Sequence, residues 1–401
     1  MLRYMQGMWD SFFPTEPVFP LQIVGSSDAA VVECMEDLEK ALQNQFYLFT
    51  YREGFEPIAA VTRSVETDQG WGCLLRTTQM LLAHFLAVYG HPADRKLSLF
   101  FDHSGESAPF SIHNMIRRVW NRRAFKPEYW SPSQGCEAVK QTMHDAMQTH
   151  QLETRVSVVT SSNGCIYSDE VRRAFKEGAA VVLVLAAVRV SAAPFLTQES
   201  YLQIEKLMEQ PQCLGVVGGI PGRSYYFFAH NQTQVLYFDP HQHTHLALTN
   251  NSSAAMSTVT PSLQDVRCVH WSRVDTSLFV AFAVRSREEW ARLESQIPTK
   301  FLHVEAQRTR RDFEQLVRTR QERRTFGEAT FISPLQTTCD GSGPSTNCAP
   351  GGVPLSSTAP PAKRRTLRIE KSQDGRGGAA AGGGNDEKEN SANSESWEYL
   401  D

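Results

Sequence analysis

The eight cysteines of this chain lack the close pairing that metal sites need. They lie at positions 34, 73, 136, 165, 213, 268, 339 and 348, and no two of them form a CxxC pair. Scattered thiols of this kind are typical of a reducing compartment. We therefore expect a cytoplasmic protein, and we expect it to need no metal ion or other cofactor.

We expect neither a secretory leader nor a membrane-spanning segment. Its first residues, MLRYMQGMWDSFFPTEPVF, show no charged head followed by an uninterrupted apolar core and a small-residue cleavage site. The most apolar stretch, AAVVLVLAAVRV at 179–190, is interrupted by Arg189 and is shorter than the roughly 20 residues that span a bilayer. This stretch is typical of a buried strand.

A strong excess of one charge is absent as well. The 40 lysine and arginine residues are balanced by 44 aspartate and glutamate residues, which leaves a formal net charge of -4. A dedicated nucleic-acid-binding protein normally shows a strong basic excess, so we expect no nucleic-acid partner. With 401 residues, 41% of them hydrophobic, the chain is long enough for one large catalytic fold with appended segments.

Composition divides the chain into three parts. Residues 1–30 are aromatic and proline-punctuated without periodicity, which predicts an extended N-terminal arm rather than a regular element. Residues 31–325 carry the apolar patterns of a catalytic domain, which ends in an arginine-rich surface helix at about 305–324. After Pro334 the sequence turns to serine, threonine, proline and glycine, so residues 326–401 are predicted to form a disordered tail.

Helical patterns come first in the domain, and strand patterns come later. Helices are predicted at 31–45, from Cys73 to Gly90 and from Gly135 onwards, and a strand or extended segment at 46–58. The later strand-like runs lie at 155–159, 181–188, 213–220, 224–230, 234–241 and 277–284. This order predicts an α+β fold, with an active site where the helix of Cys73 meets the sheet.

The segment DQGWGC places Cys73 at the start of a predicted helix. Unpaired backbone NH groups and the positive end of the helix dipole stabilise a thiolate in the first turn. Gly70 and Gly72 permit a tight turn and a close approach of backbone to that thiol. The alternative is that Cys73 is a small buried hydrophobe, as most free cysteines are.

The segment YFDPH supplies a base and a residue that can orient it. Asp239 and His241 stand two apart, so on an extended chain they project to one face, and Pro240 restricts the backbone between them. One imidazole nitrogen can then bond to Asp239 while the other faces a nucleophile. Two alternatives stay open: a surface histidine in an Asp-Pro turn, and a metal-binding face made by histidines 241, 243 and 245.

Together these segments resemble the autophagin family, which are cysteine proteases of papain-like fold that process the ubiquitin-like modifier of autophagy after a C-terminal glycine. The matching segments follow one another in order over about residues 46–293. They are FTYREGFEPI (49–58), DQGWGCLLRTTQMLLAHFL (68–86), PFSIHNM (109–115), YWSPSQ (129–134), LGVVGGIPGRSYYFFAH (214–230), FDPH (238–241) and VDTSLFVAFAVRSREEW (274–290).

The resemblance implies a role for each residue of the two chemical segments. Cys73 resembles the family nucleophile, His241 its general base and acid, and Asp239 the residue that orients the histidine. Tyr51 resembles the side chain that helps to stabilise the oxyanion. Trp130 resembles the tryptophan that covers the nucleophile until substrate lifts it, although a plain core aromatic is an alternative.

Further residues are expected to bind substrate. Besides Trp130, a narrow channel that admits only glycine would be lined by Trp71, Gly72, Gly218 and Gly219. The chain departs from the usual family pattern at positions 69, 220 and 222, where it has glutamine, isoleucine and glycine. We therefore expect an active member with a divergent substrate groove.

The last residues, SESWEYLD, resemble a WxxL ligand motif for the autophagy modifier. Trp397 and Leu400 stand three apart after an acidic stretch, and such a peptide can add a strand to a partner's sheet. WDSF at 9–12 is a weaker second candidate.

The resemblance implies that the enzyme matures the modifier precursor and removes the modifier from phosphatidylethanolamine. Its partner would be the modifier in both forms, with transient contact to autophagic membrane through the substrate. A non-catalytic adaptor that binds through its tail is one alternative. A papain-like protease of the deubiquitinase type, with another substrate, is the second.

Overall fold

The computed structural model describes residues 16–25, 31–120, 125–161, 164–220 and 222–308. All of these belong to one unit of the chain, Met1–Ala329. The predicted disordered tail, with Trp397 and Leu400, lies outside the described residues, as do WDSF and most of the predicted arginine-rich helix.

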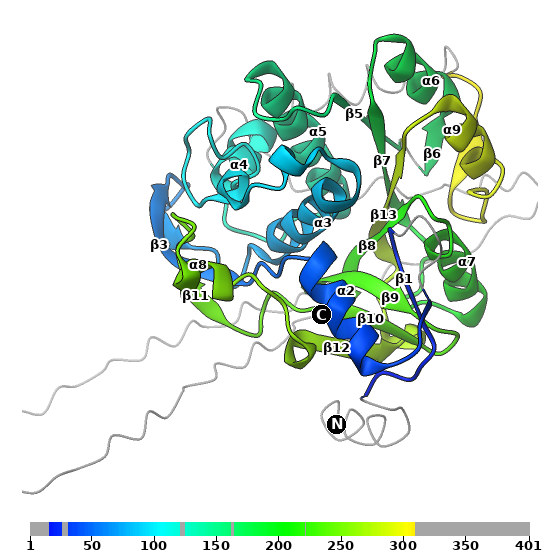
Figure 1. Cartoon of the computed structure of the whole chain (residues 1–401), viewed down its shortest axis with the longest axis horizontal. Helices are drawn as coiled ribbons and strands as arrows, with labels where there is room; N and C mark the ends of the chain where they lie inside the picture. Colours follow the sequence, from blue (N-terminus) through cyan, green and yellow to red (C-terminus); the bar gives the residue numbers. More distant parts are fainter. Residues whose placement is uncertain (1–15, 26–30, 121–124, 162–163, 221, 309–401) are drawn as a thin grey trace, which may run out of the picture. The chain divides into compact units, whose positions relative to one another are not determined.

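A large mixed sheet is the centre of the fold (Figure 1). Along its main path the strands follow one another as β12 (Val266–His270), β10 (Gln234–Phe238), β9 (Arg223–His230), β8 (Cys213–Ile220), β13 (Ser277–Val284), β7 (Val181–Arg189) and β5 (Val156–Thr160). Only β5 and β7 on this path pair in parallel, and the other neighbours are antiparallel. The main path therefore consists of antiparallel strands, with one parallel pair, β7 and β5, at its edge.

The middle of this sheet is buried on both faces. In β7, VVLVLAAVR, the residues from Val181 to Ala186 are all buried, and seven of the eight residues of its partner β13 are buried too. Continuous apolar runs without alternation are what two covered faces require. The apolar stretch at 179–190 is thus a central strand, as predicted.

Helices cover the sheet from both sides (Figure 1). Helix α3 (Cys73–Tyr89) packs on β8 and β9 and is buried at every position from Cys73 to Leu86. Near it lie α2 (Met35–Gln45), α4 (Ile112–Trp120) and α5 (Pro132–Gln148). The other helices contact strands of the large sheet: α6 (Ser168–Lys176) contacts β7, α7 (Gln198–Met208) contacts β8, and α9 (Arg287–Glu294) contacts β13. Smaller elements are α8 (Ser253–Ser257) and the parallel pair of β6 (Cys165–Tyr167) with β14 (His303–Glu305).

A second, three-stranded sheet lies at one end of the domain. It has the order β11 (Thr244–Leu246), β3 (Tyr51–Ile58), β4 (Val65–Thr67), and β11 pairs with β3 in parallel. The backbone NH of Tyr51 also donates a hydrogen bond to the carbonyl of Pro240 at 3.1 Å. This small sheet therefore brings the first predicted strand beside the DPH segment, across nearly 190 positions of sequence.

The α+β class is confirmed, and three details of the prediction are wrong. Residues 21–23, expected in an irregular arm, form β1, which pairs with β9 and with β2 (Val31–Val32). The predicted helix at 31–45 therefore starts only at Met35. The arginine-rich helix was expected from Glu305, but this residue ends β14. In each case pairing with another strand decided the local structure, and no local periodicity reveals such pairing.

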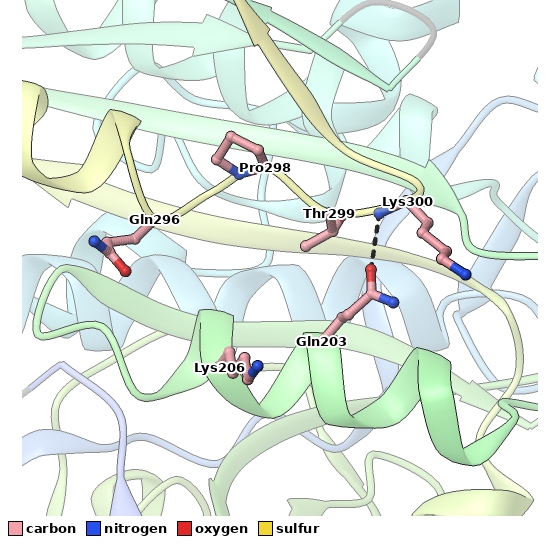
Figure 2. A pocket seen from close by; sticks show the side chains of 6 residues that line it. All are labelled: Gln203, Lys206, Gln296, Pro298, Thr299 and Lys300. Carbon is pink, nitrogen blue, oxygen red and sulfur yellow. Dashed lines mark hydrogen bonds between the residues drawn. The ribbon is translucent and has the colours of Figure 1, made fainter.

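The helices of the described part do not have the length and apolar character of a membrane span. A shallow surface hollow lies between α7 and the segment that follows α9 (Figure 2). A hydrogen bond of 2.8 Å joins its two sides, from the backbone NH of Lys300 to the side-chain oxygen of Gln203. None of the residues predicted for catalysis lines this hollow.

Candidate active site

A tight turn delivers Cys73 to the first position of α3. The backbone NH groups of Trp71 and Gly72 both donate to the carbonyl of Asp68, at 3.2 and 2.8 Å. Gly70 has φ +85°, and a Cβ on Gly72 would lie 2.6 Å from the Cβ of Asp68, so both positions require glycine. Cys73 itself is only 2% exposed. The sequence-based reason for the two glycines is thus borne out by the geometry of the turn.

A network of buried charged side chains, Asp68, Arg76 and Asp102, fixes this turn. The carboxylate of Asp68 accepts a bond from the side chain of Arg76 at 2.5 Å and one from the backbone NH of Arg52 at 2.6 Å. Arg76 continues to Asp102 at 2.9 Å, and the side chains of Asp68, Arg76 and Asp102 have no exposed surface. The sequence analysis did not identify this network. The available signal was an arginine in a largely apolar helix, eight residues after the aspartate of the preceding turn.

His241 is fixed by its neighbour two residues earlier. Its Nδ1 lies 2.5 Å from Oδ1 of Asp239, and the same oxygen accepts the backbone NH of His241 at 2.8 Å. This pair assigns the proton of the imidazole to Nδ1 when the ring is neutral. Nε2 is buried and makes no hydrogen bond of normal geometry among the described residues.

The charge state of His241 follows from its two partners. Burial lowers the pKa of this imidazole, but the hydrogen bonds and negative charges of Asp239 and Cys73 outweigh burial and raise the pKa to about 9. The thiol of Cys73 is thus within interaction range of Nε2. A protonated histidine beside a cysteine is the arrangement that stabilises a thiolate nucleophile. The structure therefore brings together all three residues of the predicted constellation.

Tyr51 packs against the histidine ring. Its own ring meets that of His241 edge to face, with centroids 5.2 Å apart at 89°, and it is 5% exposed. Burial and the negative charge of Cys73 raise the pKa of the phenol far above its usual range. A phenol that keeps its proton can donate a hydrogen bond to an oxyanion beside Cys73.

Both predicted tryptophans are buried. Trp71 donates its indole NH to the carbonyl of Thr67 at 3.0 Å and packs edge-on against Phe125 at 5.0 Å. Trp130 precedes α5, whose Gly135 approaches Leu74 of α3. Its indole NH has no partner among the described residues, although the side chain is 5% exposed. Whether either ring shapes a substrate channel stays a prediction.

Gly218 and Gly219 have a packing reason that the sequence analysis did not foresee. A Cβ on Gly219 would lie 1.9 Å from the carbonyl oxygen of Arg223, and one on Gly218 would lie 2.8 Å from the Cβ of Leu278. The β8–β9 hairpin and its contact with β13 therefore exclude larger residues. A contact of either glycine with substrate stays a prediction.

A metal-binding histidine face finds no support. His241 faces Asp239, while the rings of His243 and His245 lie beside one another with centroids 5.8 Å apart. Within the described ranges, no three side chains suited to a metal ion gather in one place.

A further aromatic at the site was missed from the sequence. The rings of Tyr225 and His241 meet edge to face, with centroids 5.8 Å apart at 80°, so the imidazole contacts two tyrosine rings. Burial and the charge of Asp239 raise the pKa of Tyr225 to about 12. The sequence does not show which face of the strand Tyr225 occupies, because the residues on both faces of SYYFFAH are buried.

Comparison with known proteins agrees with this geometry. Residues 35–296 match the family model described as the peptidase C54 catalytic domain, and this segment contains Cys73, Asp239 and His241. The chain belongs to the peptidase C54 family. This membership confirms the predicted autophagin family and the predicted cysteine peptidase activity.

Fungal proteins are among the similar sequences. The probable cysteine protease atg4 of Schizosaccharomyces pombe is 30% identical over 262 residues, which cover 64% of this chain and 76% of that protein. The probable cysteine protease ATG4 of Pichia angusta is 28% identical over 286 residues, or 63% of this chain and 55% of that protein. The cysteine protease ATG4 of Candida albicans is 34% identical over 181 residues, or 44% and 40%.

Proposed function

We propose that this cysteine peptidase hydrolyses the amide bond that follows the C-terminal glycine of the ubiquitin-like autophagy modifier. The observation that carries the proposal is the meeting of Cys73, at the start of α3, with a histidine held by Asp239 at 2.5 Å. The names of the fungal relatives, cysteine proteases of the Atg4 type, support the substrate class.

In the proposed mechanism the sulfur of Cys73 attacks the glycine carbonyl as a thiolate, with the proton held on His241. The oxyanion accepts hydrogen bonds from the phenol of Tyr51 and from backbone NH groups at the start of α3. Collapse of the intermediate breaks the amide bond, and Nε2 of His241 gives its proton to the departing amine. His241 then deprotonates a water molecule, which hydrolyses the thioester and regenerates the thiol.

Two substrates share this chemistry. In the precursor the amine belongs to the next residue of the peptide, and in the lipidated form it belongs to phosphatidylethanolamine. Because both are amides of the same glycine, one site serves precursor maturation and delipidation, and contact with the autophagic membrane is made through the substrate. Trp71 and Trp130, both 5% exposed near the nucleophile, would exclude residues with larger side chains from the scissile position.

The test is incubation of the full chain with the modifier extended by several residues beyond its glycine, followed by mass measurement of the products. The wild type should release a product that ends at the glycine, and the Cys73→Ser variant should bind the modifier without cleaving it. Cleavage elsewhere, or retained cleavage by the variant, would overturn the proposal. Binding without cleavage by either protein would assign the chain to the adaptor class, and cleavage of ubiquitin instead would assign it to the deubiquitinase type.

A further inference from the structure

The first residue of β9 is a cation beside the proposed catalytic residues. Arg223 is exposed, whereas every other residue of this strand is buried. Side chains two apart on a strand share one face and start about 7 Å from each other. Arg223 therefore lies on the same face as Tyr225, whose ring contacts His241 edge to face.

The start of β9 is held against the helix of the nucleophile. On the face opposite Arg223, the hydroxyls of Ser224 and Thr77 are 2.8 Å apart, and Thr77 donates to the carbonyl of Cys73 at 3.0 Å. The carbonyl of Arg223 also packs against Gly219 so closely that no side chain fits there. The backbone of Arg223 is thus fixed relative to Cys73, and only its side chain reaches solvent.

The guanidinium group is oriented but has no full counter-ion. It interacts with the side chain of Tyr225, and the negative charge of Asp239 acts on it from further away. Among the ion pairs of the described residues, none includes Arg223. The carboxylate of Asp239 instead accepts hydrogen bonds from His241. The cation therefore retains donors for an anion that approaches the catalytic residues from solvent.

We propose that Arg223 binds the phosphodiester of the leaving group when the modifier is joined to phosphatidylethanolamine. This inference rests on the proposed cleavage after the terminal glycine and names the residue that recognises one class of leaving group. In that lipid only two carbons and one oxygen separate the amide nitrogen from phosphorus. When the glycine carbonyl lies at Cys73, the phosphate is thus held close to the imidazole that Tyr225 contacts. The planar fork of arginine matches two phosphate oxygens.

The experiment compares two soluble amides of the same modifier glycine. One carries glycerophosphoethanolamine as its amine and the other an uncharged alkylamine of similar length, and kcat/KM is measured for each. The ratio of the two values cancels effects on the fold and on binding of the modifier. In Arg223→Gln this ratio should fall about tenfold, because charge-assisted hydrogen bonds to the phosphate are lost. Arg223→Lys should recover part of it, since lysine keeps the charge without the fork.

Arg292→Gln is the matched control, because it removes an equally exposed arginine from α9. Its ratio should equal that of the wild type. A third substrate, with glutamate as the leaving residue, separates phosphate from carboxylate recognition. A vesicle-bound conjugate measured in parallel should show the same loss in Arg223→Gln as the soluble phosphodiester.

An unchanged ratio in Arg223→Gln would overturn the inference while leaving the proposed function intact. An equal loss with the glutamate substrate would overturn the assignment to phosphodiesters. If the wild type released neither amine, the proposed function itself would fall, and the inference with it.

Discussion

The two halves of the candidate active site are held by different physics. On the nucleophile side, the turn before Cys73 is fixed by Asp68, Arg76 and Asp102, whose side chains are fully buried and charged. On the base side, His241 is fixed by Asp239 two residues away, and both side chains are partly exposed, at 17% and 16%. The first half should therefore couple to the stability of the whole domain. Substitutions on the base side should lower the stability of the domain less than substitutions on the nucleophile side.

Replacing Asp239 with asparagine should give the largest loss of activity. The amide cannot hold Nδ1–H of His241 and balance its charge as a carboxylate does, so kcat should fall about 10³- to 10⁴-fold. The free energy of unfolding should fall by less than the roughly 3–5 kcal/mol that breaking a fully buried pair costs, since both side chains are partly exposed. Kinetics and urea unfolding on one preparation measure both.

Asp265→Asn is the control for this substitution. Asp265 accepts bonds from the backbone and side chain of Ser262, which is a similar local arrangement in a nearby turn, but it contacts neither His241 nor Cys73. Its kcat should match that of the wild type. If kcat fell equally in Asp239→Asn and Asp265→Asn, the loss could not be assigned to the contact between Asp239 and His241.

Replacing Arg76 with methionine should give the opposite result, a loss of stability first. The change leaves Asp68 and Asp102 buried without their cation, and breaking a buried pair in this way costs about 3–5 kcal/mol. Urea unfolding at pH 7 measures it. Arg173→Met, which removes a largely exposed pair with Asp169 on α6, should cost less than about 1 kcal/mol. Equal costs in the two variants would refute the contrast between the two halves.

Replacing Tyr51 with phenylalanine should have an intermediate effect on rate. The ring that packs on His241 remains, while one hydrogen-bond donor to the oxyanion is lost, so kcat should fall about 10- to 100-fold with KM little changed. Single-turnover kinetics would separate the chemical step from binding. A rise in KM with kcat unchanged would instead assign the phenol to substrate binding.

The smallest expected effect is the dependence of stability and rate on pH, and its direction is well defined. The pKa of His241 is raised from its ordinary 6.5 to about 9, so its ion pair contributes stability that is complete below about pH 6.5 and is lost as the pH rises through 9. The rate should fall over the same upper limb, because a neutral imidazole cannot protonate the departing amine. In Asp239→Asn the limb should move to lower pH. A wild-type rate that stays flat to pH 10 would contradict this assignment.

Much of the architecture was predictable because its signals are local. The apolar run at 181–188 and the aromatic run at 224–230 predict strands, and the long apolar pattern after Cys73 predicts a buried helix. Each element forms within one or two residues of its expected bounds. The strand at 21–23 was not predictable. Three residues carry too little periodicity, and their structure comes from pairing with Ala229 and His230.

For the site, the sequence by itself determined the chemistry of the reacting groups and their local geometry. A glycine-flanked cysteine before an apolar helix and a DPH segment are read within a few residues, because turn and helix-start geometry depends on near neighbours. Only the tertiary structure decided what surrounds them: the buried charges of Asp68 and Arg76, and the two tyrosine rings that pack against His241. These contacts join residues far apart in the chain, where burial and packing select partners that no local pattern encodes.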